Sequence, residues 1–173
     1  MITLGLDVGY AALGWALFDG ATLYDLGTVV TAPADTPHAS AELMRRSREI
    51  ASAVRGLCRH GVRHVVMEAV SWPRSGSVIG KMGAAYGAVS AALACEVPLV
   101  HVEHLSPQAV RKGLGLAKDA DKDALLTAVR EAPGCERLDE LLADVRTKAL
   151  RRHPTDACAV VLAARRLAEG RAA

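Results

Sequence analysis

The chain has 173 residues, of which 51% are apolar and 23% are charged, with a net charge of +2 and a pI of about 8.4. This composition excludes a disordered chain and predicts a single domain, residues 1–173, with an ordinary hydrophobic core. The small excess of basic residues is a weak indication of a nucleic-acid partner.

Cysteine usage and the N-terminal sequence both predict a cytoplasmic protein. The four cysteines lack the spacing of metal ligands, so we expect buried thiols in a reducing compartment; they are Cys58, Cys95, Cys135 and Cys158. The first predicted strand begins at Ile2, which leaves no room for a signal segment, and no apolar stretch reads as long and polar-free enough to span a bilayer. We therefore expect no membrane partner.

The first part of the chain predicts an antiparallel meander. Residues 2–7, 13–18 and 22–30 read as strands, and Asp19-Gly20 is a hairpin signal between the second and the third.

Helices alternate with two more strands in the rest of the chain. A helix over 41–60 is expected to be capped by Ser40 and ended by Gly61. The remaining elements are a strand at 63–67, a helix at 77–95, a strand at 98–102, and helices at 106–113, 120–131, 137–150 and 154–169. This order predicts an α/β fold whose mixed five-stranded sheet has three antiparallel strands, then parallel ones, with helices on both faces.

Three acidic residues stand where a strand or helix should end, namely Asp7, Glu68 and Asp156. Right-handed crossovers would place Asp7 and Glu68 side by side at one carboxyl edge of the sheet, where α/β proteins bind ligands. Because a buried carboxylate is costly without a cation, three converging carboxylates predict a divalent-metal cage of the kind that handles phosphate. Taken singly, Asp7 with Gly9 also matches phosphate loops, and Glu68 also matches an ordinary strand-exit acid.

The segment His153-Pro154-Thr155-Asp156 has two interpretations. Proline is favoured in the first turn of a helix, which would leave His153 extended and place Asp156 at the positive end of the helix dipole. Either His153 and Asp156 flank one metal ion, or Asp156 caps the helix by accepting hydrogen bonds from free backbone amides.

Gly80, Gly83 and Gly87 fall inside the helix expected over 77–95. Each glycine costs a helix about 1 kcal/mol relative to alanine. We therefore expect these positions to allow another backbone to pack closely, either that of a partner chain or that of the protein's own sheet.

Taken together, these segments resemble the RuvC family of Holliday junction resolvases, within the RNase H-like superfamily. The segment GLDVGYAALGWALFD is similar to the family's opening strands, and VVMEAVSWPRSGSVIGKMGAAYGAV to its second acid and the following helix. The segment VEHLSPQAVRKGLGLAKDADKDALLTAV resembles the family's basic region, and HPTDACAVVLAA its closing acid and helix. The resemblance spans nearly the whole chain.

The resemblance implies a role for individual residues. Asp7, Glu68 and Asp156 match the metal-binding carboxylates, and His153 matches the family position three before the last acid. These four residues would hold two Mg²⁺ or Mn²⁺ ions per active site, and Lys122 matches a catalytic basic residue near the scissile phosphate. The glycine helix matches the family's dimer interface. The residues expected to contact DNA are Trp72, Arg74, Arg111, Lys118, Lys122, Arg151 and Arg152.

Some features depart from the family pattern. Tyr86 stands where an arginine is common, and residues 132–150 look longer than the usual connection before the last acid. The family's loop after the second acid often carries an aromatic that wedges into the junction, and Trp72 lies within one position of that site. Because the chain has only six aromatic residues, one Phe, two Trp and three Tyr, a stacking or wedge role is favoured for Trp72.

The resemblance implies a structure-specific endonuclease that resolves four-way junctions by metal-dependent hydrolysis, without a covalent intermediate. Two ions would clamp the attacking water and the leaving oxygen, with Asp7 bridging them and Lys122 offsetting charge on the phosphate. Glu68 would hold one ion, and His153 with Asp156 the other. A homodimer would present two identical sites to the two-fold symmetric junction and make paired nicks. A branch-migration helicase is a candidate partner.

Three other functions stay open. One is a YqgF-type nuclease that acts on RNA, or a related enzyme that cleaves flaps or forks. A second is an actin-like ATP-binding fold in which Asp7-Val8-Gly9 cradles phosphate, although that fold normally needs a second domain. The third is a non-catalytic protein that binds junctions.

Overall fold

The computed structural model describes residues 1–36, 38–70, 75–97 and 100–172. Five strands form one sheet in the order β3-β2-β1-β4-β5. The strands are β1 (Ile2–Val8), β2 (Ala12–Asp19), β3 (Thr22–Val30), β4 (Val62–Glu68) and β5 (His101–Leu105). The first three pair antiparallel, whereas β4 runs parallel to both β1 and β5. The predicted mixed sheet is therefore confirmed.

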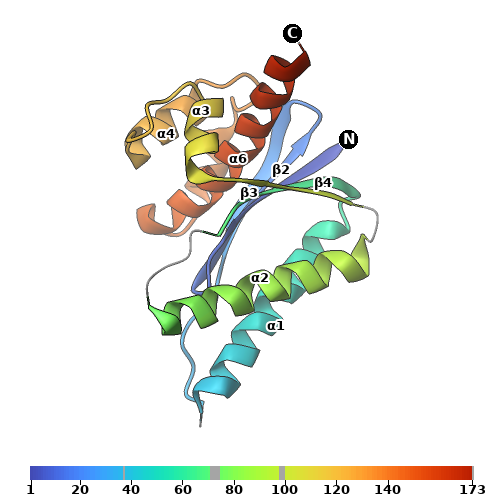
Figure 1. Ribbon diagram of the computed structural model, residues 1–173, viewed down its shortest axis with the longest axis vertical. Coiled ribbons are helices and arrows are strands. Elements are labelled where there is room, and N and C mark those ends of the chain that lie inside the picture. Colours follow the sequence, from blue (N-terminus) through green and yellow to red (C-terminus); the bar gives the residue numbers. More distant parts are fainter. Residues whose placement is uncertain (37, 71–74, 98–99, 173) are drawn as a thin grey trace.

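Helices cover both faces of the sheet, as Figure 1 shows. One face carries α1 (Ala39–Cys58) and α2 (Gly76–Glu96), which lie against each other. The other face carries the long C-terminal α6 (Lys148–Ala172) and three shorter helices, which are α3 (Pro107–Gly113), α4 (Lys122–Arg130) and α5 (Leu138–Ala143). Because successive strand residues point to opposite faces, the sheet separates two hydrophobic cores, one beneath α1 and α2 and one beneath α6.

The alternation along β1 decides where its acid points. Leu4, Leu6 and Val8 enter the core beneath α1 and α2. The intervening residues face α6, and a Cβ built on Gly5 would lie 2.1 Å from the carbonyl oxygen of Ala157 in that helix. Asp7, two residues after Gly5, therefore lies on the α6 side of the sheet.

The last helix differs from the sequence-based expectation. The sequence predicts a helix at 137–150 and another that starts at Pro154, but α5 ends at Ala143 and α6 begins at Lys148. Pro154 therefore lies inside α6 and cannot donate to the carbonyl of Leu150 four residues earlier. The hydroxyl of Thr28 in β3 donates to that carbonyl instead, at 3.0 Å. A contact from a distant strand thus satisfies the group that the proline leaves free.

The start of α1 and the bounds of β5 also differ from the sequence-based prediction. The sequence predicts Ser40 as the cap of the first helix, but α1 starts at Ala39, after His38, and has no side-chain cap. The strand expected at 98–102 is β5 at His101–Leu105, and residues 98–99 lie outside the described part of the chain. Of the cysteines, Cys58, Cys135 and Cys158 are buried as predicted, but Cys95 is exposed.

Helix α2 corrects the expectation about membrane spans. By length and composition alone, this helix could cross a membrane. The core helix of a soluble protein can have the same length and composition. Only 22% of its most apolar stretch is buried. Its buried residues are Ala85, Val89, Ala92 and Leu93, which join the core that α1 shares. The opposite side of α2 is therefore apolar and open.

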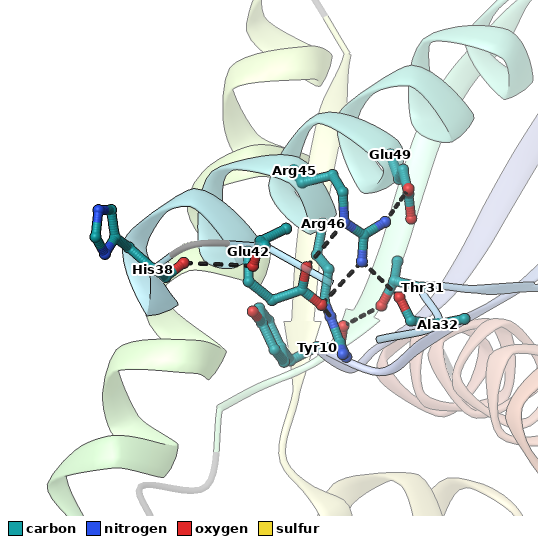
Figure 2. Close-up of polar contacts among 9 residues, drawn as sticks. Tyr10, Thr31, Ala32, His38, Glu42, Arg45, Arg46 and Glu49 are labelled. Carbon is teal, nitrogen blue, oxygen red and sulfur yellow. Dashed lines mark hydrogen bonds and ion pairs between the residues drawn. The ribbon is translucent and has the colours of Figure 1, made fainter. Parts of the chain in front are cut away.

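The turn after β1 is anchored to α1, as Figure 2 shows. The guanidinium of Arg46 lies 4.9 Å from the ring centroid of Tyr10, and its Nε donates to Glu42 at 2.6 Å. Arg45 donates to Glu42 at 2.8 Å and to the carbonyl of Ala32 at 2.5 Å. Hydrogen bonds from Arg45 and then Arg46 lower the pKa of Glu42 to about 2. Arg46 therefore holds the turn that follows Asp7, and Arg45 holds the chain that leaves β3.

Candidate active site

Asp7 and His153 meet because glycine separates β2 from α6. Asp7 is paired across the sheet with Gly14 of β2. A Cβ at Gly14 would lie 2.2 Å from the carbonyl carbon of His153, so only glycine lets α6 come this close. The approach puts His153 Nδ1 2.6 Å from Asp7 Oδ2. With Nδ1 engaged by Asp7, Nε2 is the ring nitrogen that remains for another ligand.

The packing of the turn after β1 gives Gly9 a structural role of its own. A Cβ at Gly9 would lie 2.6 Å from the carbonyl oxygen of Ala12, within the same turn. The tight connection between β1 and β2 is therefore sufficient to require glycine there.

Asp156 lies one turn after His153, on the same side of α6. Its Oδ2 accepts a hydrogen bond from Lys122 Nζ at 2.5 Å. Lys122 is the first residue of α4, whose start is fixed by the Asp121 carboxylate accepting from the Ala124 amide at 2.8 Å. Because α6 begins at Lys148, Asp156 lies outside the first turn and pairs with Lys122, so the capping interpretation is wrong.

Glu68 ends β4 beside β1, as the right-handed crossover predicts. Its backbone carbonyl accepts a hydrogen bond from the Tyr86 hydroxyl at 2.6 Å. Its side chain helps to line a cavity of about 60 Å³, together with Arg111, Lys122 and Asp156. Sequence reasoning assigned no role to Tyr86; the available signal is a lone aromatic in a helix of small residues.

The pKa shifts indicate that the three carboxylates share one site. Burial raises the pKa of Glu68, and the charges of Asp7 and Asp156 raise it further. Burial also raises the pKa of Asp156, against the opposing hydrogen bond from Lys122. The hydrogen bond to Asp7 raises the pKa of His153. Deprotonation of all three carboxyl groups is therefore unfavourable without a metal ion. A bound divalent cation would favour the deprotonated carboxylates.

The donor set suits Mg²⁺ or Mn²⁺, because three carboxylates supply hard oxygen ligands and one imidazole is tolerated by Mn²⁺. Among the described residues, one group of three potential ligands has all its ligand atoms within 4.8 Å of one another. This group lies elsewhere, at His64, His101 and Glu103. The acidic donors are thus spread more widely than the ligands of one ion.

A larger cavity of about 490 Å³ opens next to Asp156, between α4, α5 and the start of α6. Its basic lining residues are Lys122, Arg130, Lys148, Arg151 and Arg152. Three of them, Lys122, Arg151 and Arg152, are among the residues that the sequence predicts to contact DNA. The residues predicted from sequence to contact DNA do not include Arg130 or Lys148, although Lys148 is close to Arg151 in the sequence. Arg130 pairs with Asp139 at 2.8 Å.

The other predicted DNA contacts are more scattered. Arg111 donates to the backbone carbonyls of Ala120 at 3.0 Å and Pro107 at 3.2 Å, and thereby closes the connection from α3 to α4. Lys118 is exposed in that connection. Trp72 and Arg74 lie outside the described residues.

The glycines of α2 do not pack against the protein's own sheet. A Cβ built at Gly80, Gly83 or Gly87 would meet no atom of the described residues within 4 Å. The alternative prediction, in which the protein's own sheet packs against these glycines, is therefore wrong. They form an open face of small residues on α2.

The sheet order, the acids at the ends of β1 and β4, and a further acid on the last helix define an RNase H-like nuclease fold. Among solved structures, RuvC of Thermus thermophilus matches with a TM-score of 0.73 and 25% identity, over 98% of this chain and 96% of that one. T. thermophilus RuvC in complex with a Holliday junction substrate matches with a TM-score of 0.74 and 24% identity, over the same shares. The chain is thus RuvC-like along its length, and the predicted resemblance is confirmed.

The fold is also that of the yeast mitochondrial Holliday junction resolvase, with a TM-score of 0.64 and 9% identity over 95% of this chain and 77% of that one. No family model and no curated protein matches the chain.

We expect the metal-free protein to lose stability as the pH rises above about 6.5. The pKa of His153 is raised by Asp7, so in this range the folded chain binds more protons than the unfolded chain. The stabilisation is complete below the unfolded pKa of about 6.5 and is lost as the pH passes the folded value. The raised pKa values of Glu68 and Asp156 also lower stability as the pH rises, but this loss begins lower, near the unfolded carboxyl pKa of about 4.

Thermal unfolding in EDTA at several pH values measures this loss. Mg²⁺ at a hundred times its dissociation constant should restore about 2.7 kcal/mol, which is a rise of roughly 5–10 °C in Tm. The Asp7→Asn variant should show a flatter pH profile and a smaller response to Mg²⁺. Metal-free protein that grows more stable over this range would contradict the prediction.

Proposed function

We propose that the protein is a structure-specific endonuclease that resolves four-way DNA junctions by metal-dependent phosphodiester hydrolysis. The observation that carries this proposal is the meeting of Asp7, Glu68, His153, Asp156 and Lys122, which come from β1, β4, α6 and α4, at one edge of the sheet. Support comes from T. thermophilus RuvC, a structural neighbour that was solved in complex with a Holliday junction substrate.

Asp7, Glu68, His153 and Asp156 would hold two Mg²⁺ or Mn²⁺ ions. When bound, such ions activate a water molecule and stabilise the leaving oxygen of an in-line displacement. Asp7 holds the His153 ring through Nδ1, and Tyr86 holds the end of β4 through the Glu68 carbonyl. Both contacts fix ligand positions before substrate arrives, which lowers the reorganisation needed during the reaction.

Lys122 has two partners in this proposal. In the structure its ammonium pairs with Asp156. Once Asp156 is neutralised by a cation, the Lys122 ammonium would be available to the scissile phosphate, where a positive charge stabilises the transition state. The pair therefore keeps the charge of the half-buried Asp156 carboxylate compensated until ions bind.

The cavity beside Asp156 would accept the DNA backbone. Arg151 and Arg152 lie on its wall together with Lys148, next to the catalytic carboxylates. Phosphate contacts of this kind read backbone shape and make affinity fall steeply with salt. They suit a substrate that is recognised by its branched shape.

A homodimer through the open glycine face of α2 would allow paired nicks. Gly83→Arg should yield a monomer, because the long side chain would fill the space that a partner backbone needs, while arginine is a better helix former than glycine. Light scattering gives the oligomeric state. The matched control is Gly56→Arg in α1, where a Cβ also meets nothing within 4 Å. A Gly83→Arg protein that stays dimeric would exclude this interface.

Trp72 would act as the wedge or stacking residue at the junction centre. Loss of one aromatic stack costs about 1–3 kcal/mol, so Trp72→Ala should lower junction cleavage by roughly five- to a hundredfold, and Trp72→Phe should restore most of it. A fluorescent base analogue at the branch point reports the distortion. Normal distortion of the junction by Trp72→Ala protein would remove the wedge role.

The decisive experiment uses a synthetic four-way junction with each strand labelled in turn. We expect Mg²⁺-dependent nicks at symmetric positions on two opposing strands, in one encounter with a homodimer. Preferential cleavage of flaps, forks or structured RNA would instead favour a nuclease of another RNase H-like type, as in YqgF. Junction binding without any cleavage would indicate a non-catalytic binding protein. A cytoplasmic role in DNA recombination and repair, with a branch-migration helicase, would follow from the first result.

A further inference from the structure

We propose that His64, His101 and Glu103 form a second metal site, for a transition-metal ion such as Zn²⁺. The site lies on β4 and β5, apart from the carboxylates of the candidate nuclease centre. It does not depend on the proposed nuclease function.

The backbone brings the three side chains to one face. His64 of β4 is the register partner of His101 of β5, and Glu103 follows His101 by two residues. Residues two apart on a strand point to the same face of a sheet. The three ligand atoms all lie within 4.8 Å of one another. The imidazole rings of His64 and His101 have their centroids 5.1 Å apart.

His64 Nε2 is the atom that most needs a partner. It is buried and has no hydrogen-bond partner among the described residues. The nearest carboxylate oxygen, Glu103 Oε2, is 3.6 Å away, which is too far for a hydrogen bond. A buried polar atom left without a hydrogen-bond partner destabilises the folded state. Binding of the Nε2 lone pair to a metal ion would remove that cost.

The protonation state of His64 favours a metal over a proton. Burial and the charge of His101 lower the pKa of His64, and this outweighs the opposing effect of the Glu103 carboxylate. A neutral imidazole is the form that ligates metals. The Arg165 guanidinium donates hydrogen bonds to the Ala21 carbonyl at 3.0 Å and to the Gly20 carbonyl.

Two imidazoles and one carboxylate favour transition metals over Mg²⁺. Zn²⁺, Fe²⁺, Co²⁺ and Ni²⁺ accept such a set, with water in the open positions, whereas Mg²⁺ prefers oxygen ligands alone. Ligands of a tetrahedral Zn²⁺ lie about 3.4 Å from one another. His101 is exposed and Glu103 only half-buried, so small side-chain rotations can close the present spacing.

The position of the site suggests a structural role. Glu68 lies four residues beyond His64 on β4, about 13 Å along the strand, so the two sites are separate. In the sheet order β5 is a terminal strand, paired with β4. An ion shared by β4 and β5 would therefore clamp this edge strand, which leads into α3 and the wall of the Glu68 cavity.

The test uses Co²⁺ as a spectroscopic probe on full-length, untagged protein that carries Asp7→Asn and Glu68→Gln. These substitutions weaken ion binding at the nuclease centre, so failure of this site leaves the nuclease proposal intact. We expect one equivalent of Co²⁺ to bind with visible d–d absorption, to resist excess Mg²⁺, and to be displaced by Zn²⁺. His101→Gln and Glu103→Gln should each weaken binding by about tenfold or more.

The matched control is His104→Gln, an exposed histidine of β5 whose side chain alternates to the other face. It should leave Co²⁺ binding unchanged, and Zn²⁺ should raise the Tm of this control but not of His101→Gln. Absence of one-equivalent absorption, or binding that survives His101→Gln and Glu103→Gln, would overturn the proposal.

Discussion

Replacing Asp7 with Asn is expected to lower junction cleavage by about a thousandfold or more, because ligation of the catalytic ions supplies several kcal/mol of transition-state stabilisation. Asparagine keeps the size of the side chain and can still accept a hydrogen bond from His153 Nδ1, so the fold should persist. Binding of a junction without metal should survive or improve, since one negative charge near the phosphates is removed.

Single-turnover cleavage of a four-way junction, with binding measured separately in EDTA, tests this expectation. Glu68→Gln should behave in the same way. The matched control is Asp35→Asn, an exposed aspartate in the loop before α1, which should cleave normally. Cleavage at the parental rate by either site variant would show that the catalytic ions are held elsewhere.

Gly14→Ala is expected to cost about 3 kcal/mol or more and to impair cleavage with it. The added Cβ would lie 2.2 Å from the carbonyl carbon and 2.3 Å from the carbonyl oxygen of His153, and neither backbone can rotate out of the way. Helix α6 must then shift from β2, which draws His153 away from Asp7. A loss of this size would lower Tm by roughly 6–12 °C.

Thermal unfolding and junction cleavage of the same preparation measure both effects. Gly56→Ala in α1 is the matched control, because its Cβ would meet nothing within 4 Å. It should be neutral or stabilising by up to about 1 kcal/mol, since alanine is the better helix former. Wild-type stability and activity in Gly14→Ala protein would mean that the close approach of α6 is not required.

Much of the sheet could be predicted because its signals are local. Alternating apolar residues define β1 and β2, and the Asp19-Gly20 pair marks the turn that leads to β3. The right-handed crossover rule then placed Glu68 beside the β1 strand that carries Asp7. Chain order and these rules are sufficient to bring two acids to one edge.

The last third of the chain was harder to predict because distant groups decide its boundaries. A proline normally marks the start of a helix, yet Pro154 lies inside α6, where Thr28 of β3 satisfies the Leu150 carbonyl. Thr28 is more than a hundred residues from Leu150 in the sequence, so no local pattern could predict this hydrogen bond. The same applies to Tyr86, whose partner is a backbone carbonyl of another element.

Sequence alone therefore determined the α/β class, the mixed sheet with β1 beside β4, and the candidate acids Asp7, Glu68 and Asp156, because periodicity, turns and handedness act over short stretches. Only the tertiary structure decided that Lys122 pairs with Asp156, that Gly14 admits α6, and that two histidines join Glu103 on neighbouring strands. Those arrangements depend on which surfaces pack together, and packing is a property of the whole chain rather than of any segment.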